Sequence, residues 1–332
     1  MNIKDRKDLL VRLGEYMSGS DEEWQATKTQ ASVENQWFTP EFIDLAINNI
    51  IHNYLQPSQL QFLIDEYDLH DNDNPRSIGL VLAGNIPLVG FHDLLSVFIT
   101  GHYTMVKPSS KDEVLVKHII QKMVELDPAA KKYFNVRDLL KGAYAFIATG
   151  SNNSSRYFEY YFRNHPHIIR KNRTSVAVLT GKESAEELEK LADDVHQYFG
   201  LGCRNVTKIY VPEHYEFEPL LDVFKKYHYL IDHNKYKNNY DYNLAIHMLN
   251  KKYYMTNGSI LLVKDESPFS PISQLNYSFY TNGEQVKNEL DKNEAIQCVV
   301  SKQDVNFGEA QTPGICDFAD GVDTIEFLRN IH

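Results

Sequence analysis

The stretch LEKLADDVHQYFGLGCRNVTKIYV, Leu188–Val211, decides the interpretation of this chain. Its first half carries apolar residues at helical spacing, which predicts an amphipathic helix with one buried face formed by Leu191, Val195, Tyr198 and Phe199. Gly200 and Gly202 should end this helix, because glycine adopts backbone angles that other residues reach only at a cost. Apolar residues then alternate with mostly polar ones over 206–211, which predicts a strand.

Cys203 lies on the turn between that helix and that strand. Gly202 leaves room for a ligand or another chain to approach the backbone, and the positive charge of Arg204 favours the thiolate over the thiol. A reactive cysteine fits this setting. The alternative is a buried, inert cysteine, which is the commoner fate of a lone intracellular thiol.

The composition excludes several classes of protein. A length of 332 residues predicts about two domains, and 42% hydrophobic residues are enough for a folded core. The formal charge of −11 argues against nucleic acid and anionic membrane surfaces as partners. The 3 cysteines are far apart, there is no secretory signal at Met1 and there is no membrane-spanning apolar run, so we expect a soluble, cytoplasmic protein.

Two segments resemble metal or nucleic-acid sites only superficially. The loop 71–75 alternates Asp and Asn, but Arg76 and Leu82 occupy the positions where a calcium loop needs Gly and Glu. Residues 225–243 interleave aromatic and basic residues without any known nucleic-acid module. Their histidines, His228 and His233, lack partners at metal-ligand spacing and are expected to be solvated loop residues. We therefore expect no metal.

The order of elements indicates an α/β fold. Residues 1–70 are expected to be helical, with a helix start at Thr39-Pro40-Glu41. From residue 78 onward, strands alternate with helices, the strands being expected at 78–83, 103–106, 144–148, 175–180, 206–211, 259–263 and 295–300. Such alternation predicts parallel sheets with helices on both faces. A second α/β unit is expected to begin near Arg170.

Three of the predicted strands end in polar loops: Gly84-Asn85, Lys107-Pro108-Ser109 and Thr149-Gly150-Ser151. Ligands of parallel sheets bind beyond the carboxyl ends of the strands, so a nucleotide would lie at these loops. The dinucleotide fingerprint GxGxxG and the Walker loop are both absent from the sequence. A nucleotide site must therefore be built in another way, or not exist.

These loops and this cysteine, in this order, resemble the aldehyde dehydrogenase superfamily, and more closely its acyl-CoA reductase branch, the fatty-acid reductases of bacterial luminescence. Each motif is weak alone, and their common order makes the resemblance specific. The matching segments are Trp37-Phe38-Thr39-Pro40-Glu41, Asn85-Ile86-Pro87-Leu88, Met105-Val106-Lys107-Pro108-Ser109, Thr149-Gly150-Ser151, Phe199-Gly200-Leu201-Gly202-Cys203 and Pro268-Phe269-Ser270-Pro271.

The resemblance implies an α/β, aldehyde-dehydrogenase-like fold, with two Rossmann-like parallel-sheet domains and the active site between them. Residues 1–170 would form the N-terminal helices and the nicotinamide-cofactor domain. Residues 171–305 would form the catalytic domain, and the tail 306–332 would pack back on the cofactor domain.

The resemblance also implies roles for individual residues. Cys203 would attack an acyl carbon and form a thioester, and the Asn85 amide with the Cys203 backbone N–H would hold the oxyanion. The alternative for Asn85 is a buried amide that merely satisfies a turn, and for Lys107 an ordinary surface lysine. The residues implied to bind the cofactor are Lys107, Ser109, Ser110, Thr149, Gly150, Ser151 and Phe269.

Three departures from the superfamily refine the prediction. Arg170 stands where hydrolytic members carry the Glu that activates water, and arginine stays protonated at any useful pH. Ser110, followed by Lys111, stands where NAD-using members often carry a Glu that repels a 2′-phosphate, which favours NADPH, with NADH as the alternative. Ser267 replaces a Glu that contacts the nicotinamide ribose in many members.

The sequence therefore predicts an NADPH-preferring reductase that converts an acyl thioester, a fatty acyl-CoA or acyl carrier thioester, into an aldehyde through a Cys203 acyl-enzyme. A homo-oligomer is expected. The nearest alternative is a hydrolytic or phosphorylating aldehyde dehydrogenase. A second alternative is a non-catalytic scaffold of the same fold that binds an acyl carrier or a sister subunit.

Overall fold

The computed structural model describes residues 1–150 and 152–331. The chain divides into two compact units. The first consists of Met1–Asn172 together with Pro313–His332, and the second of Arg173–Thr312. Residues 306–312 thus group with the second unit, where Asp194 accepts hydrogen bonds from the backbone N–H groups of Gly308 and Ala310.

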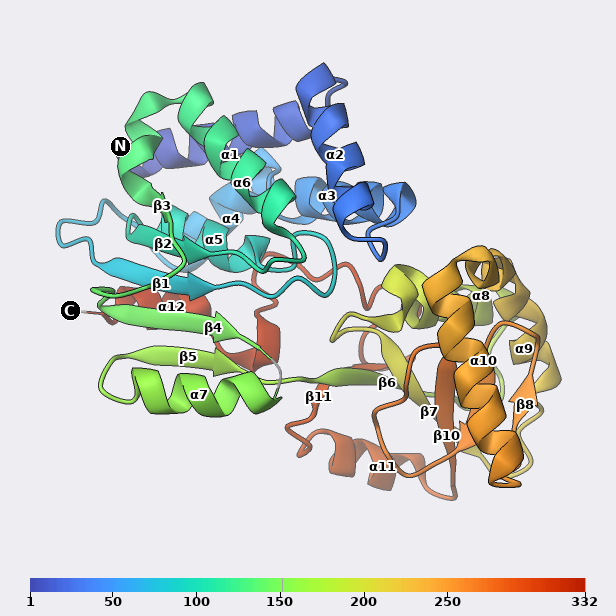
Figure 1. Ribbon diagram of the computed structural model, residues 1–332. Coiled ribbons are helices and arrows are strands. Elements are labelled where there is room, and N and C mark those ends of the chain that lie inside the picture. The colour runs from blue at the N-terminus through green and yellow to red at the C-terminus, as the bar shows by residue number, and fades with distance from the viewer. Residues whose placement is uncertain (151, 332) are drawn as a thin grey trace. The chain divides into compact units, whose positions relative to one another are not determined.

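The first unit begins with a group of helices that pack on one another and on α6 (Figure 1). The helix start predicted at Thr39 is confirmed, since its side chain accepts the N–H of Phe42 and Pro40 opens the helix. The helices and 3₁₀ turns of this unit are α1 Ile3–Ser18, α2 Glu22–Glu34, α3 Pro40–Asn53, α4 Pro57–Glu66, α5 Phe91–Ile99, α6 Glu113–Leu126, η1 Pro128–Tyr133, α7 Asn152–Phe162, η4 Ala319–Gly321 and α12 Thr324–Arg329.

Sheet A of the first unit is parallel, with strand order β3-β2-β1-β4-β5. The order reverses between β1 and β4, which is the topological switch point where open α/β sheets bind ligands. The strands of the middle of the sheet, β1, β2 and β4, have consecutive buried residues, as a parallel sheet covered on both faces requires, whereas the edge strands β3 and β5 are partly exposed. The strands of sheet A are β1 Ser77–Val81, β2 Tyr103–Lys107, β3 Phe134–Val136, β4 Ala145–Thr149 and β5 His167–Arg170.

The second unit is built on sheet B, with strand order β11-β6-β7-β10-β9-β8. The described pairs are parallel except β8 with β9. Its elements are β6 Thr174–Val178, α8 Ala185–His196, η2 Gln197–Gly200, β7 Val206–Pro212, α9 Glu218–Val223, η3 Phe224–Asp232, α10 Asn234–Leu249, β8 Met255–Thr256, β9 Leu261–Lys264, β10 Gln274–Tyr280, α11 Gly283–Leu290 and β11 Ile296–Val300. The predicted α/β class with parallel sheets is confirmed.

The segment 225–243 differs from the prediction. It forms η3 and most of α10 rather than a loop. Tyr227, Tyr236 and Tyr240 are buried, whereas Tyr229 and Tyr242 are exposed. His228 is exposed, as predicted. His233 is not a solvated loop residue: it accepts the N–H of Tyr236 as the cap of α10, and its ring packs on Phe199 with 4.7 Å between centroids.

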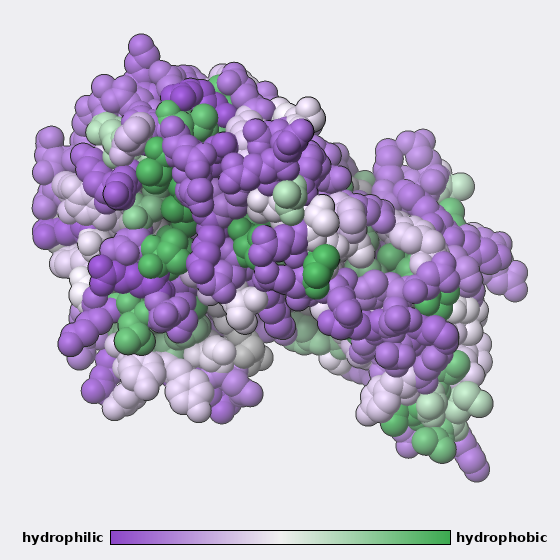
Figure 2. Space-filling view, turned by 45° about the horizontal axis from the view of Figure 1, so that its top comes forward, coloured by the Kyte–Doolittle hydropathy of each residue, from purple (hydrophilic) through white to green (hydrophobic). Residues whose placement is uncertain are grey.

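The surface in view is mainly hydrophilic in both units, as the negative charge of the chain leads one to expect (Figure 2). Among the residues that the structure describes, no helix has the length and apolar character needed to cross a bilayer.

Candidate active site

The turn that carries Cys203 differs from the predicted helix end. α8 begins with a capping box between Ser184 and Glu187, but it ends at His196. Tyr198 and Phe199, predicted on its apolar face, instead have left-handed backbone angles, with φ of 55° and 58°. Such angles cost roughly 1–2 kcal/mol per residue. Both rings are almost fully buried, and this burial compensates the backbone cost.

Cys203 is the second residue of a four-residue turn closed by the N–H of Asn205 on the carbonyl of Gly202, at 3.1 Å. The predicted turn is confirmed. The cysteine is half-buried and forms no disulfide. Its backbone carbonyl accepts a hydrogen bond of 3.1 Å from the hydroxyl of Ser175 on β6. A neighbouring strand therefore holds the backbone of the short turn that carries Cys203.

A second cysteine lies behind this turn. The Ser175 hydroxyl that binds the Cys203 carbonyl is 3.1 Å from the sulfur of Cys298 and accepts the Cys298 N–H at 3.2 Å. Burial raises the pKa of the Cys298 thiol, and hydrogen bonds from Ser175 and Arg204 only partly oppose this. Cys298 is half-buried. The Arg204 guanidinium, expected to favour a thiolate at Cys203, is engaged with Cys298.

The turn that contains Phe269 is held by side chains of β7 and β10. The Thr207 hydroxyl of β7 donates to the carbonyl of Pro268 at 2.6 Å, and the Asn276 amide of β10 donates to the carbonyl of Phe269 at 3.1 Å. The structure thus brings this turn within four residues of Cys203 along β7, inside the second unit. The Phe269 ring is half-buried, and Ser267 is exposed.

The polar loops of the first unit meet at one edge of sheet A. Residues 84–85 follow β1, 107–110 end β2 and 149–150 end β4, and β1 pairs with both β2 and β4 in parallel register. Their predicted convergence at the carboxyl edge is confirmed by this register. Lys107 and Ser110 are exposed, whereas Asn85, Ser109 and Thr149 are half-buried. Ser151 lies outside the described residues.

Two of these loops are in direct contact. A Cβ at Gly84 would lie 2.7 Å from the Cβ and Oγ of Ser109, so only glycine fits there. The Asp112 carboxylate, at the start of α6, accepts the Leu88 N–H at 2.7 Å, and burial raises its pKa well above the ordinary value. Asp112 was missed by the sequence analysis. An acidic residue directly before an amphipathic helix is the signal that could have found it.

Arg170 ends β5 inside the first unit and is buried. Its guanidinium forms a 2.5 Å ion pair with Asp93 of α5 and donates to the Thr324 hydroxyl of α12 at 2.8 Å. Asp93 was also missed, although a single acid within the apolar segment Phe91–Ile99 is a signal for a buried ion pair. The position of the expected hydrolytic base is thus occupied by a structural cation.

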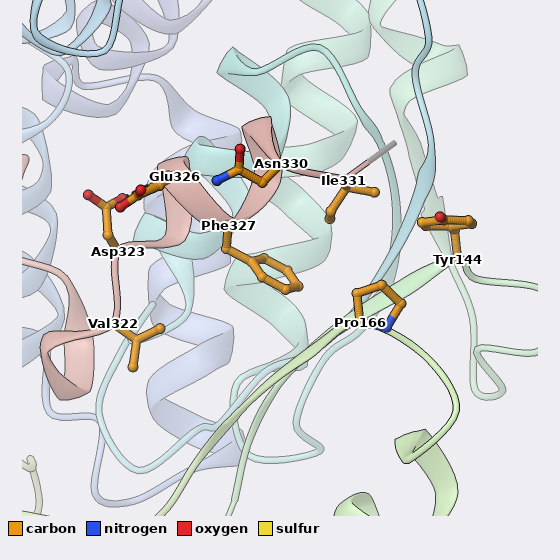
Figure 3. Close-up of a pocket in the computed structure, with 8 residues that line it drawn as sticks. All are labelled: Tyr144, Pro166, Val322, Asp323, Glu326, Phe327, Asn330 and Ile331. Carbon is orange, nitrogen blue, oxygen red and sulfur yellow. Dashed lines mark hydrogen bonds between the residues drawn. The ribbon is translucent and has the colours of Figure 1, made fainter.

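A cavity of 580 Å³ lies at the other edge of sheet A (Figure 3). Tyr144 and Pro166 stand directly before β4 and β5, so this cavity is at the amino ends of the strands. The remaining lining comes from the C-terminal segment: Val322, Asp323, Glu326, Phe327, Asn330 and Ile331. None of the predicted site residues lines it, and the described residues contain no cluster of metal-binding side chains.

Comparison of the coordinates with solved structures shows the fold. The chain is similar to the aldehyde dehydrogenase KauB from Pseudomonas aeruginosa, with a TM-score of 0.67 and 14% identity over 87% of this chain and 69% of that chain. It is similar to an oxidoreductase from Marinobacter aquaeolei, with a TM-score of 0.66 and 12% identity over 91% of this chain and 74% of that chain. A Mycobacterium tuberculosis aldehyde dehydrogenase complexed with NAD+ gives a TM-score of 0.63 and 11% identity over 86% of this chain and 70% of that chain.

Comparison of the sequence shows the family. No sequence among the curated proteins matches the chain. The sequence model of the acyl-CoA reductase (LuxC) family matches residues 35–221, more than half of the chain and a span that includes Asn85, Lys107, Arg170 and Cys203. The chain therefore belongs to the acyl-CoA reductase (LuxC) family, which makes it an oxidoreductase of aldehyde-related chemistry on the aldehyde dehydrogenase fold.

Proposed function

We propose that this protein reduces an acyl thioester, a fatty acyl-CoA or an acyl carrier thioester, to an aldehyde through an acyl-enzyme on Cys203. The observation that carries the proposal is the setting of Cys203, which is half-buried on a tight turn between α8 and β7 in a chain of the acyl-CoA reductase family. A nucleophile on a turn whose backbone is held by hydrogen bonds is suited to covalent catalysis.

In the first step, the thiolate of Cys203 attacks the acyl carbon and a new C–S bond forms. The thiol of the carrier leaves with the electrons of the old C–S bond and takes up a proton. The negative charge that develops on the acyl oxygen needs preorganised donors, for which we propose the Asn85 side-chain amide and the Cys203 backbone N–H.

NADPH, when bound, supplies the hydride that reduces the acyl-enzyme. The Cys203 sulfur then leaves the reduced carbon with the electrons of the C–S bond, and the aldehyde departs. Ammonium and hydroxyl groups at the carboxyl edge of sheet A, on Lys107, Ser109, Ser110 and Thr149, are the donors that ribose and phosphate oxygens need. We propose that they bind the cofactor together with Gly150, Ser151 and Phe269.

Two further features support reduction rather than hydrolysis, and NADPH rather than NADH. Arg170 is buried in its ion pair with Asp93 and cannot activate water. Ser110 and Lys111 are exposed beside Ser109, so a neutral hydroxyl and a cation stand where a Glu at position 110 would repel a 2′-phosphate. In this proposal residues 1–170 bind the cofactor and 171–305 carry the acyl group, in a cytoplasmic homo-oligomer. Of the tail 306–332, only the part from Pro313 onward completes the cofactor domain, because 306–312 belong to the second unit.

The test is intact-protein mass spectrometry after mixing with a fatty acyl-CoA. We expect a mass increase of one acyl group without NADPH, its loss on adding NADPH, and release of aldehyde. Cys203→Ala should abolish all three, while Cys316→Ala, the matched control in the first unit, should abolish none. Full activity in Cys203→Ala would overturn the proposal. Rapid conversion of aldehyde to carboxylic acid without coenzyme A would favour a hydrolytic enzyme, and absence of any acylation would favour a scaffold.

A further inference from the structure

The side chain of Asn205 is fully buried and bound to both ends of the segment that leads to Cys203. Its amide nitrogen donates to the carbonyl of Asp194 at 3.0 Å and to the carbonyl of Gln197 at 2.9 Å, both at the end of α8. Its amide oxygen accepts the N–H of Gly202 at 2.7 Å. One side chain thus satisfies two terminal helix carbonyls and the residue directly before the nucleophile.

Between these two attachment points the backbone is in a conformation that it does not adopt readily. Tyr198, Phe199 and Gly200 all have left-handed angles, with φ of 55°, 58° and 73°. Such a segment persists only where the surrounding structure holds it, and segments of this kind occur at functional sites. The Asn205 amide is bound to Gln197 directly before the segment and to Gly202 two residues after it.

We propose that Asn205 is a positioning residue for Cys203: its amide holds the left-handed segment closed and thereby sets the direction from which the thiolate meets the acyl carbon. The proposal rests on the proposed function in naming Cys203 as the nucleophile. Asn205 itself touches neither substrate nor cofactor in this scheme. Its hydrogen bonds are all to backbone atoms, so its effect on the reaction passes through the geometry of the turn.

Two variants separate the parts of this arrangement. Asn205→Ala removes the amide altogether. Asn205→Asp retains an oxygen for the Gly202 N–H, but places a second oxygen against the carbonyls of Asp194 and Gln197, so the attachment to α8 is lost. The matched control is Asn257→Ala, since Asn257 also bridges backbone segments in the second unit, donating to Leu221 and accepting from Ser259 and Ile260.

The experiment compares two reactions of Cys203 in the same folded proteins. Acylation by a fatty acyl-CoA requires a fixed approach geometry, and we expect Asn205→Ala and Asn205→Asp to slow it by about 10- to 100-fold. Alkylation by iodoacetamide requires only an accessible thiolate, and we expect its rate to change by less than about threefold, because a small reagent tolerates many approach directions. Asn257→Ala should leave both rates unchanged. Equal slowing of both reactions, or wild-type acylation in both Asn205 variants, would overturn the proposal.

If the wild-type protein is not acylated at all, the proposed function fails. Hydrogen exchange then tests the positioning role of Asn205 on its own. The Gly202 amide should then exchange faster in either Asn205 variant than in the wild type, while Asn257→Ala leaves it protected. Unchanged protection in the Asn205 variants would refute the positioning role independently of any activity.

Discussion

Replacing Arg170 by Met should destabilise the first unit by about 3–5 kcal/mol, because it leaves the Asp93 carboxylate buried without its cation. The two side chains are only 6% and 5% exposed, so water cannot replace the missing guanidinium. The variant also removes the donor to Thr324 on α12. With a urea dependence of roughly 2 kcal/mol per molar, the unfolding midpoint should fall by about 1.5–2.5 M.

The paired variant Asp93→Leu/Arg170→Met should recover most of that loss. The ion pair uses one carboxylate oxygen of Asp93. The other oxygen of Asp93 and the Nε of Arg170 have no hydrogen-bond partner among the described residues. Replacing both residues removes these two unsatisfied atoms together with the buried charges. An apolar pair at such a site is often neutral or stabilising, so we expect a stability within about 1 kcal/mol of the wild type.

The assay is urea unfolding followed by tryptophan fluorescence. Both tryptophans of the chain, Trp24 and Trp37, lie in the first unit with the ion pair, so the signal reports on that unit. Lys171→Met is the matched control, because Lys171 pairs with Glu159 at 3.0 Å but is 59% exposed, and should lose at most about 1 kcal/mol. A shift in Arg170→Met no larger than in Lys171→Met would refute the reasoning, as would a paired variant as unstable as the single one.

Three further predictions concern other groups. Asp112→Ala should lower stability by about 1–3 kcal/mol and reduce kcat, because the Leu88 N–H near Asn85 loses its acceptor. Asp112→Asn keeps an acceptor and should retain both stability and kcat. Urea unfolding and steady-state kinetics measure these effects, and equal effects of the two variants would contradict the prediction. Burial raises the pKa of Asp194 from 3.8 to about 7, so between these pH values the folded chain holds a proton that the unfolded chain has lost. The stability due to this group should therefore fall as pH rises through that range. Thermal unfolding should show that the melting temperature of Asp194→Asn depends less steeply on pH than that of the wild type, and an unchanged dependence would count against the prediction. Ser110→Glu should lower kcat/KM for NADPH relative to NADH by at least about tenfold through repulsion of the 2′-phosphate, and an unchanged ratio would exclude Ser110 from cofactor selection.

Local patterns were sufficient for much of the fold. Alternation of apolar strands and amphipathic helices predicted the parallel sheet of the first unit, and Thr39 with Pro40 located a helix start. Strand β10 was not predicted, since its buried face carries polar side chains such as Asn276 and Ser278, and a hydrophobic pattern does not detect polar groups satisfied by distant backbone. Segment α10 was missed because half of its buried face is polar, at Asn243 and His247, while the apolar side chain of Tyr242 is exposed, so no apolar stripe marks the helix.

The sequence by itself determined the order of the elements, the polar loops that end β1, β2 and β4, and a cysteine on a turn after a helix, because caps, glycines and periodicity act within a few residues. Only the tertiary structure decided that Arg170 pairs with Asp93, that Asp112 holds Leu88 and that Asn205 joins α8 to the Cys203 turn. Each of these contacts satisfies a buried polar group. Which partner satisfies it depends on how strands and helices pack across the unit, and no local pattern encodes that packing.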